Sequence, residues 1–143
     1  MRRGNFLVWR RPGLAEFLRF VFAHFDLAVW TSAARHNAAS LVSLVFGEDE
    51  PRLKFVYDQS RCEAIATGDK KPLFRKDLAA VWSNFPAYNQ TNTILVDDSD
   101  AKALRNPSGC HFNPGTWSHQ DRNDGGLLPE GVLWRFLETN VGR

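Results

Sequence analysis

Two adjacent carboxylates, Asp97 and Asp98, directly follow the continuous apolar run of residues 93–96. The run is short, apolar and rich in β-branched residues, which predicts a buried strand. Magnesium prefers hard oxygen ligands and retains several waters, so carboxylates at a strand end indicate a candidate magnesium site. The alternative is a turn or a helix cap, because Asp and Ser favour such positions for their backbone hydrogen bonds alone.

Two hydroxyls and a lysine are candidate anion-binding groups. Thr31 and Ser32 end the apolar run of residues 26–30, and a phosphate oxygen there could accept from their hydroxyls and from nearby backbone amides. Lys76 could neutralise a phosphate as a point charge. The alternatives are an ordinary strand end for the hydroxyls and a solvated basic cluster, residues 70–76, for the lysine.

The remaining chemistry-bearing residues point to no second site. Cys62 and Cys110 are far apart and lack a CxxC partner, so we expect free thiols. His111 and His119 flank a loop rich in Pro and Gly, without a nucleophile pattern around them, and we expect structural roles. The sequence holds no P-loop and no GxGxxG pattern.

The elements that must position these residues alternate in type. Amphipathic or apolar spacing predicts helices over residues 14–25, 36–46, 76–82 and 129–140. Compact apolar runs predict strands over residues 6–9, 26–30, 54–58 and 93–96, whereas residues 106–131 are expected to be mostly loop. This alternation predicts an α/β domain with a parallel sheet, in which ligands bind at the carboxyl ends of the strands.

Composition bounds the class of protein. The chain has 143 residues, of which 43% are hydrophobic and 24% charged, as in an ordinary single globular domain. The net charge of +2 is too small to indicate nucleic-acid binding. No apolar run approaches the ~20 residues that span a bilayer. We expect a nuclear or cytoplasmic protein, or a mitochondrial one if a targeting sequence precedes Met1.

The candidate residues also fall in the order of a known set of motifs. Residues 11–18, Arg-Pro-Gly-Leu-Ala-Glu-Phe-Leu, resemble an "RPG-x-x-EFL" helix start, and residues 28–33 resemble a second motif that ends in Thr-Ser-Ala. Residues 76–78, Lys-Asp-Leu, and residues 94–99, Ile-Leu-Val-Asp-Asp-Ser, resemble the third and fourth motifs, with Asn-Pro following at 106–107. Together, over residues 6–117, they resemble the RNA polymerase II C-terminal-domain phosphatases and NLI-interacting-factor-like proteins of the haloacid-dehalogenase superfamily. The subgroup with the ubiquitin-like-domain-containing phosphatase is especially similar.

This resemblance implies a fold, a site and a substrate. The fold would be the HAD-like three-layer sandwich around a parallel sheet. Thr31 would hydrogen-bond the transferring phosphoryl group with Ser32 beside it, and Lys76 would stabilise charge on the phosphoryl oxygens. Asp97 would bind magnesium, supported by Asp98, and the partner would be a phosphoserine or phosphothreonine protein or peptide.

The sequence departs from the family at its first motif, Asp-x-Asp-x-Thr, whose first Asp is the family's nucleophile and whose second is its acid/base. The single Asp-x-Asp in the chain, residues 98–100, is followed by Ala101-Lys102 rather than by Thr two places on, and its context fits the fourth motif better. We therefore expect one HAD-like domain over residues 1–143 that is N-terminally incomplete and lacks the central first strand. Upstream sequence would supply that strand; the alternatives are residues 6–9 or a partner chain.

Two functions follow. The first is a magnesium-dependent protein serine/threonine phosphatase that acts through an aspartyl-phosphate intermediate and is inactive as the 143-residue chain. The alternative is a non-catalytic pseudophosphatase or scaffold, similar to the mitochondrial inner-membrane translocase subunit of this fold. The physiological substrate and the oligomeric state are left open by the sequence.

Overall fold

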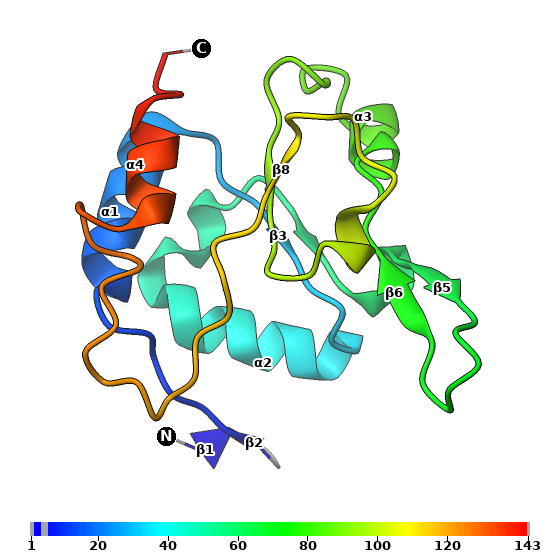
Figure 1. Ribbon diagram of the computed structural model, residues 1–143, viewed down its shortest axis with the longest axis horizontal. Coiled ribbons are helices and arrows are strands. Elements are labelled where there is room, and N and C mark those ends of the chain that lie inside the picture. The colour runs from blue at the N-terminus through cyan, green and yellow to red at the C-terminus, as the bar shows by residue number, and fades with distance from the viewer. Residues whose placement is uncertain (1, 4–5, 143) are drawn as a thin grey trace. The chain divides into compact units, whose positions relative to one another are not determined.

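Helices and short strands alternate along the chain in a computed structural model that describes residues 2–3 and 6–142 (Figure 1). The α-helices are α1 (Leu14–His24), α2 (Arg35–Phe46), α3 (Ala79–Asn84) and α4 (Val132–Glu138). The strands are β1 (Arg2–Arg3), β2 (Phe6–Leu7), β3 (Val29–Trp30), β4 (Val56–Tyr57), β5 (Glu63–Ile65), β6 (Leu73–Arg75), β7 (Leu95–Val96) and β8 (His111–Phe112). The described residues also form the 3₁₀ helices η1 (Gly47–Arg52), η2 (Gln59–Arg61) and η3 (Ala101–Ala103). None of the helices described is both long and apolar enough to cross a membrane.

The strands of the described residues form four two-stranded sheets. β7 pairs in parallel with β8, with Leu95 opposite His111. β3 pairs with β4, and the bonds Val29 N to Phe55 O and Thr31 N to Tyr57 O advance in the same direction along both strands, as parallel strands require. β5 and β6 form an antiparallel hairpin, and β1 pairs antiparallel with β2. The prediction of a mixed helix–strand fold with parallel pairing is confirmed, but the single layered sheet remains a prediction.

The chain forms two compact units, each assembled from segments that are far apart in the sequence. The first unit contains Met1–Val29, His36–Val56 and Thr116–Arg143. The second contains Trp30–Arg35 and Tyr57–Gly115, and therefore holds the ends of β3 and β4 together with β5 to β8. The organisation of residues 1–143 as one domain remains a prediction.

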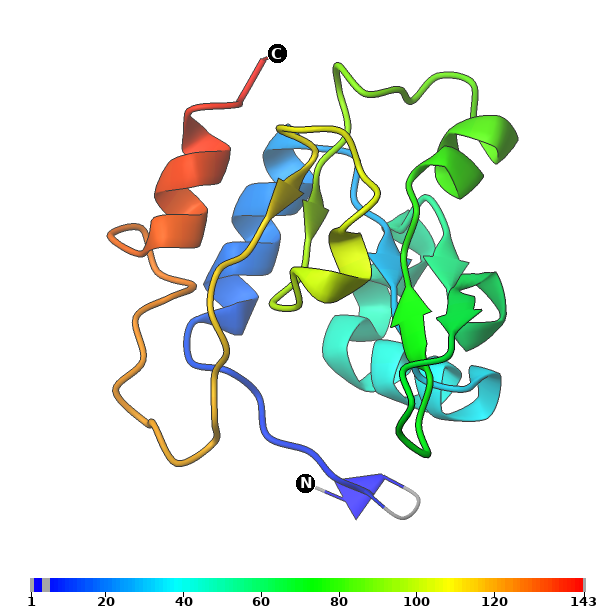
Figure 2. The same ribbon diagram turned by 45° about the vertical axis from the view of Figure 1, so that its right-hand side comes forward.

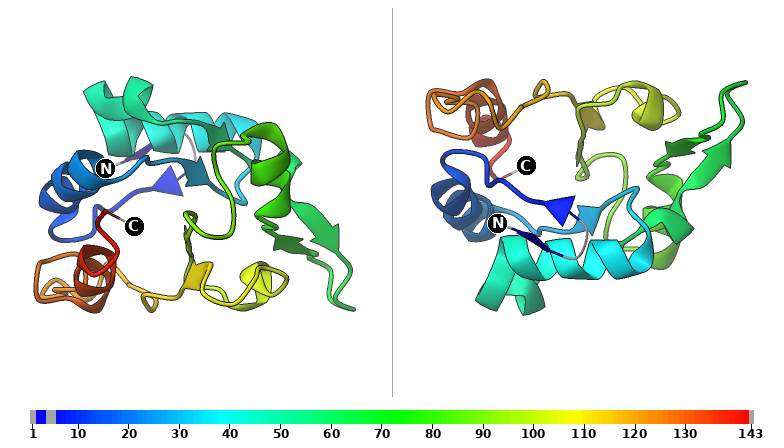
Figure 3. Two further views of the ribbon diagram at one scale, coloured as in Figure 1. Left: turned by 90° about the horizontal axis from the view of Figure 1, so that it is seen from above. Right: turned by 90° about the horizontal axis from the view of Figure 1, so that it is seen from below.

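Aromatic side chains fasten α4 to α1 in the first unit. The rings of Phe20 and Trp134 stack with their centroids 4.3 Å apart, and Phe17 meets the same indole at 6.2 Å. Figures 1 and 3 show the two helices side by side. Buried Val21 and Leu133 lie on these same helices, so the amphipathic spacing predicted the existence of both, although α4 is shorter at each end than the expected 129–140.

The start of α1 depends on a glycine rather than on the proline before it. Pro12 lies in the preceding turn, and the helix begins at Leu14 after Gly13, whose φ of 81° is left-handed. A Cβ on Gly13 would lie 2.7 Å from Cδ2 of Leu128. Glycine is therefore favoured at this position by both its backbone angle and the packing.

Other expected boundaries were wrong in ways that tertiary contacts explain. The helix expected over residues 76–82 begins only at Ala79, because the Asn106 side chain accepts from the N–H of Leu78 at 2.8 Å and donates to the carbonyl of Lys76 at 3.0 Å. The hairpin β5–β6 and the strand β8 were not expected from the sequence. Figure 2 shows β8 alongside β7, and such a two-residue strand is defined by its partner rather than by its composition.

An ion pair joins the two ends of the chain within the first unit. Arg11 donates from Nε to Asp124 Oδ2 at 2.6 Å and from Nη2 to Oδ1 at 3.2 Å. Gly126 leaves room for it, since a Cβ there would lie 2.3 Å from Nη2 of Arg11. The hydrogen bond from Arg11 lowers the pKa of the Asp124 carboxyl below its ordinary value of 3.8, against a smaller opposing effect of burial.

We predict that Asp124→Asn lowers the free energy of unfolding by about 1–2 kcal/mol at neutral pH, because it removes a bidentate, charge-assisted contact. The pKa is lower in the folded state, so the unfolded state binds more protons, and the contribution of Asp124 is complete well above pH 3.8 and is lost as the pH falls below it. Urea unfolding of both proteins from pH 7 to pH 3 measures this. A difference that stays constant over that range would contradict it.

Candidate functional site

Thr31 and Ser32 follow β3 directly, in the second unit. The backbone N–H of Thr31 continues the pairing with β4 by donating to Tyr57 O at 2.9 Å. Its hydroxyl accepts from the N–H of Ala33 at 3.1 Å, and Gln59 donates from its side chain to the carbonyl of Ser32 at 3.2 Å. The strand end and the turn after it are therefore held in place by backbone and side-chain bonds.

Lys76 and Asp97 form a buried ion pair. Lys76 Nζ lies 2.5 Å from Asp97 Oδ2, and each side chain is only 8% exposed. Lys76 follows β6 and Asp97 follows β7, so two strand ends that are 21 residues apart bring the charges together. The other Asp97 oxygen accepts from the N–H of Ser99 at 2.8 Å. The structure thus joins two of the residues that the sequence selected separately.

Lys102 links this ion pair to the hydroxyl of Ser32, and the sequence did not single it out. Its Nζ donates to Ser32 Oγ at 3.1 Å, while its carbonyl accepts from the N–H of Lys76 at 2.7 Å. Lys102 lies in η3, five residues after Asp97. No sequence signal marks it, because only the fold brings η3 beside the residue that follows β6.

Two further residues fix the backbone of the site. Asn106 bonds both Lys76 and Leu78, as described above, and so holds the strand end from which Lys76 projects. His111 Nε2 lies 2.9 Å from the carbonyl oxygen of Asp97, which requires that nitrogen to carry the hydrogen. The structural role expected for His111 agrees with this contact.

The thiol of Cys62 lies beside the end of β3. Its Sγ lies 3.9 Å from the carbonyl oxygen of Thr31. Burial raises the pKa of the Cys62 thiol, while the positive charges of Lys76 and Lys102 act in the opposite direction.

The carboxylates offer a minimal ligand set for magnesium. Asp97 is buried, whereas the Asp98 side chain is exposed and its carbonyl accepts from Asn113 at 3.3 Å. Within residues 2–3 and 6–142, no cluster of three His, Cys, Asp or Glu side chains could hold a metal ion. Mg²⁺ commonly binds through one or two carboxylates with substrate phosphate and water as its other ligands, so the hard oxygens of Asp97 and Asp98 fit this ion.

The resulting arrangement matches the needs of phosphate chemistry. Two lysines, the hydroxyl of Ser32 and a buried carboxylate belong to one connected set of contacts within one unit, and Thr31 directly precedes Ser32. Cations and hydroxyl donors stabilise the charge on the equatorial oxygens of a phosphoryl group in transfer. The sequence also matches the family described as NLI interacting factor-like phosphatase over residues 1–141.

The chain belongs to the NLI interacting factor-like phosphatase family. Similar proteins of this family include an uncharacterised FCP1 homology domain-containing protein of Schizosaccharomyces pombe, which is 31% identical over 108 residues, 68% of this chain and 44% of that protein. Ubiquitin-like domain-containing CTD phosphatase 1 of Drosophila melanogaster is 27% identical over 115 residues, 78% of this chain and 36% of the relative. The Arabidopsis thaliana ubiquitin-like domain-containing CTD phosphatase is also 27% identical, over 83% of this chain and 36% of its own length.

These relatives confirm the family expected from the motifs, including the ubiquitin-like-domain subgroup. The chain spans less than half of the length of each of the three. The family acts on phosphoproteins and is metal-dependent.

We predict that Lys76→Met lowers the free energy of unfolding by about 3–5 kcal/mol, because it leaves the Asp97 carboxylate buried without a partner. The double substitution Lys76→Met with Asp97→Leu should recover most of that loss, since a buried pair replaced by apolar groups costs little. Urea unfolding measures both. Lys54→Met is the control: Lys54 pairs with Asp26 at 3.8 Å on the exposed surface, so a loss below about 1 kcal/mol is expected. Equal losses in Lys76→Met and Lys54→Met would show that the Lys76–Asp97 pair is not buried.

Proposed function

We propose that this chain carries the phosphate-binding part of a magnesium-dependent protein serine/threonine phosphatase. The observation that carries the proposal is the buried contact of Lys76 with Asp97, which Lys102 connects to Ser32. Burying a lysine and a carboxylate costs free energy unless the geometry is good, and apolar residues would fill the same space more cheaply. The presence of this buried pair is therefore better explained by a role in binding than by a contribution to stability.

Each residue has a distinct role in this proposal. Lys76 stabilises charge on the phosphoryl oxygens by donating hydrogen bonds from its ammonium group, and Thr31 and Ser32 donate hydrogen bonds to the same group. In a site with little water, such fixed donors stabilise a phosphoryl transition state without having to reorganise. Asp97 and Asp98 would hold Mg²⁺, which supplies further positive charge to the phosphoryl oxygens when bound.

The attacking carboxylate is the part that these residues do not provide. The 143 residues contain no Asp-x-Asp-x-Thr segment, which is the nucleophile motif of the resembled family. In the described residues β3–β4 and β7–β8 are separate parallel pairs, each with two edge strands. Edge strands can accept a further strand, which supports the proposal that the motif arrives on a strand that completes the layered HAD-like sheet.

A non-catalytic binding module is the second candidate, because the contacts among Lys76, Asp97, Lys102 and Ser32 require no nucleophile. The two candidates make different predictions for the coding sequence upstream of Met1. An in-frame apolar strand that ends in Asp-x-Asp-x-Thr supports the phosphatase. A stop codon immediately upstream contradicts the phosphatase and leaves the binding module.

We predict that the chain binds a phosphoserine peptide but not the same peptide without phosphate, measured by calorimetry with and without magnesium. Thr31→Val should weaken binding about fivefold, because it removes one hydrogen bond to the phosphate. Thr67→Val, on the exposed loop between β5 and β6, is the matched control and should bind like the original chain. Thermal unfolding of each variant tests whether it is folded. Failure of the folded chain to distinguish the two peptides would refute the proposed site.

We also predict that the 143-residue chain alone does not hydrolyse an aryl phosphate in the presence of magnesium. No carboxylate motif for attack at phosphorus is present in it, and removal of one catalytic partner normally abolishes such chemistry. Release of nitrophenol from p-nitrophenyl phosphate is a direct assay. Magnesium-dependent hydrolysis that disappears in Asp97→Asn would overturn this prediction.

A further inference from the structure

We propose that Lys102 is a second phosphate-binding cation of this site and supplies the uncompensated positive charge that attracts the phosphate group to Ser32. This inference rests on the proposed function. It adds a residue that neither the motifs nor the resemblance selected, and it gives Lys102 and Lys76 different tasks.

The two lysines differ in the charge of their partners. Lys76 Nζ faces the carboxylate of Asp97 at 2.5 Å, so its charge is already balanced. Lys102 Nζ donates to the neutral hydroxyl of Ser32 at 3.1 Å. Among the described side chains, no carboxylate lies within ion-pair distance of Lys102. A dianionic phosphate that approaches these groups therefore meets a net positive charge at Lys102 rather than at Lys76.

The two lysines also differ in how deeply their side chains are buried. The Lys76 side chain is almost fully buried, whereas Lys102 is only half-buried and remains accessible to a ligand. An ammonium group has three donors, and the described contacts of Nζ use one of them. The others are available to phosphate oxygens, and Ser32 Oγ keeps its own hydrogen to donate while it accepts from Lys102.

The backbone holds Lys102 at this position. Its carbonyl accepts from the N–H of Lys76 at 2.7 Å, and its own N–H donates to Ser99 Oγ at 3.4 Å. Ser99 is bonded in turn to Asp97. The turn that carries Asp97 and the segment that follows β6 thus fix Lys102 from both sides, so that its ammonium reaches Ser32 from a rigid base rather than from a free loop.

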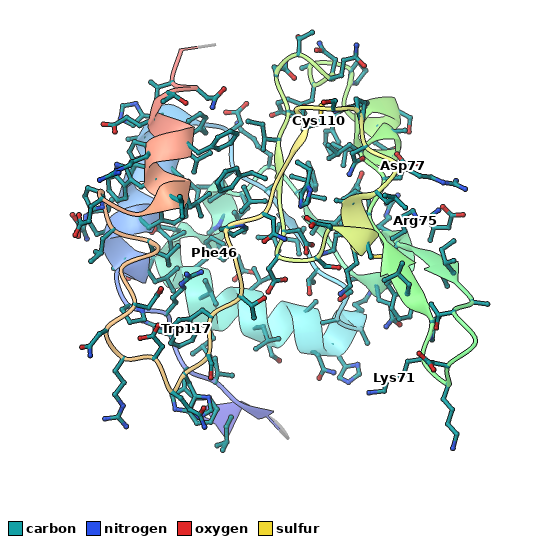
Figure 4. The ribbon with its side chains drawn as sticks, viewed as in Figure 1. Phe46, Lys71, Arg75, Asp77, Cys110 and Trp117 are labelled. Carbon is teal, nitrogen blue, oxygen red and sulfur yellow. The ribbon has the colours of Figure 1, made fainter. Side chains whose placement is uncertain are left out.

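The test measures the binding of inorganic phosphate to the 143-residue chain by calorimetry, at several salt concentrations. Lys102→Met should weaken binding about tenfold and reduce its dependence on salt, because a charge-assisted hydrogen bond and one cation are lost. Lys102→Arg keeps the charge and should recover most of the affinity. Lys71→Met removes the same charge from the exposed loop of the β5–β6 hairpin, where Figure 4 shows that side chain, and should change neither quantity.

The outcomes separate this inference from the proposed function. Phosphate binding that falls in Thr31→Val but not in Lys102→Met would overturn the role of Lys102 and leave the proposed function intact. Equal weakening in Lys102→Met and Lys71→Met would also overturn it, because the effect would then be one of general charge. A folded chain that binds no phosphate, as judged by circular dichroism and calorimetry together, would overturn both.

Discussion

The buried contact between Lys76 and Asp97 is the interaction around which the second unit is organised. The strand ends that carry the two residues have little regular structure of their own: β6 has three residues and β7 has two. Neighbouring groups satisfy the backbone around the pair, with Asn106 bonded to Lys76 and Leu78 and His111 bonded to Asp97. A buried charge pair is stable only when its remaining polar atoms are also satisfied. The same bonds that stabilise the fold therefore position the groups that would meet a phosphate.

The sheets of this chain contrast with its helices. Aromatic rings pack α1 against α4, whereas each sheet in the described residues contains only two strands. A two-stranded pair has few backbone hydrogen bonds and two exposed edges, so it contributes little stability by itself. The parallel pairs end at Thr31 and at Asp97, the residues to which the family resemblance assigns chemistry. The strand ends that carry the candidate site residues thus belong to sheets of only two strands.

The sequence predicted more of the helices than of the strands. The amphipathic spacing of Leu14, Phe17 and Val21 was sufficient to predict α1, because such a face must pack against a core whatever its partner. By contrast, β8 exists because its backbone pairs with β7, and residues 111–112 carry no pattern of their own. The late start of α3 has the same kind of cause, since Asn106 lies 28 residues away from the N–H that it captures. Local patterns cannot contain such information.

The sequence alone determined the family, because the order and spacing of its motifs can be read without knowing any contact. These motifs are residues 11–18, 28–33, 76–78 and 94–99. The sequence also selected Lys76 and Asp97 as separate candidates. Only the tertiary structure decided that they neutralise each other at 2.5 Å and that Lys102 is the cation that reaches Ser32 across 70 residues of sequence. The physical reason is that the energy of interaction between two charges falls as the distance between them grows. That distance is set by the fold rather than by the spacing of the residues along the chain.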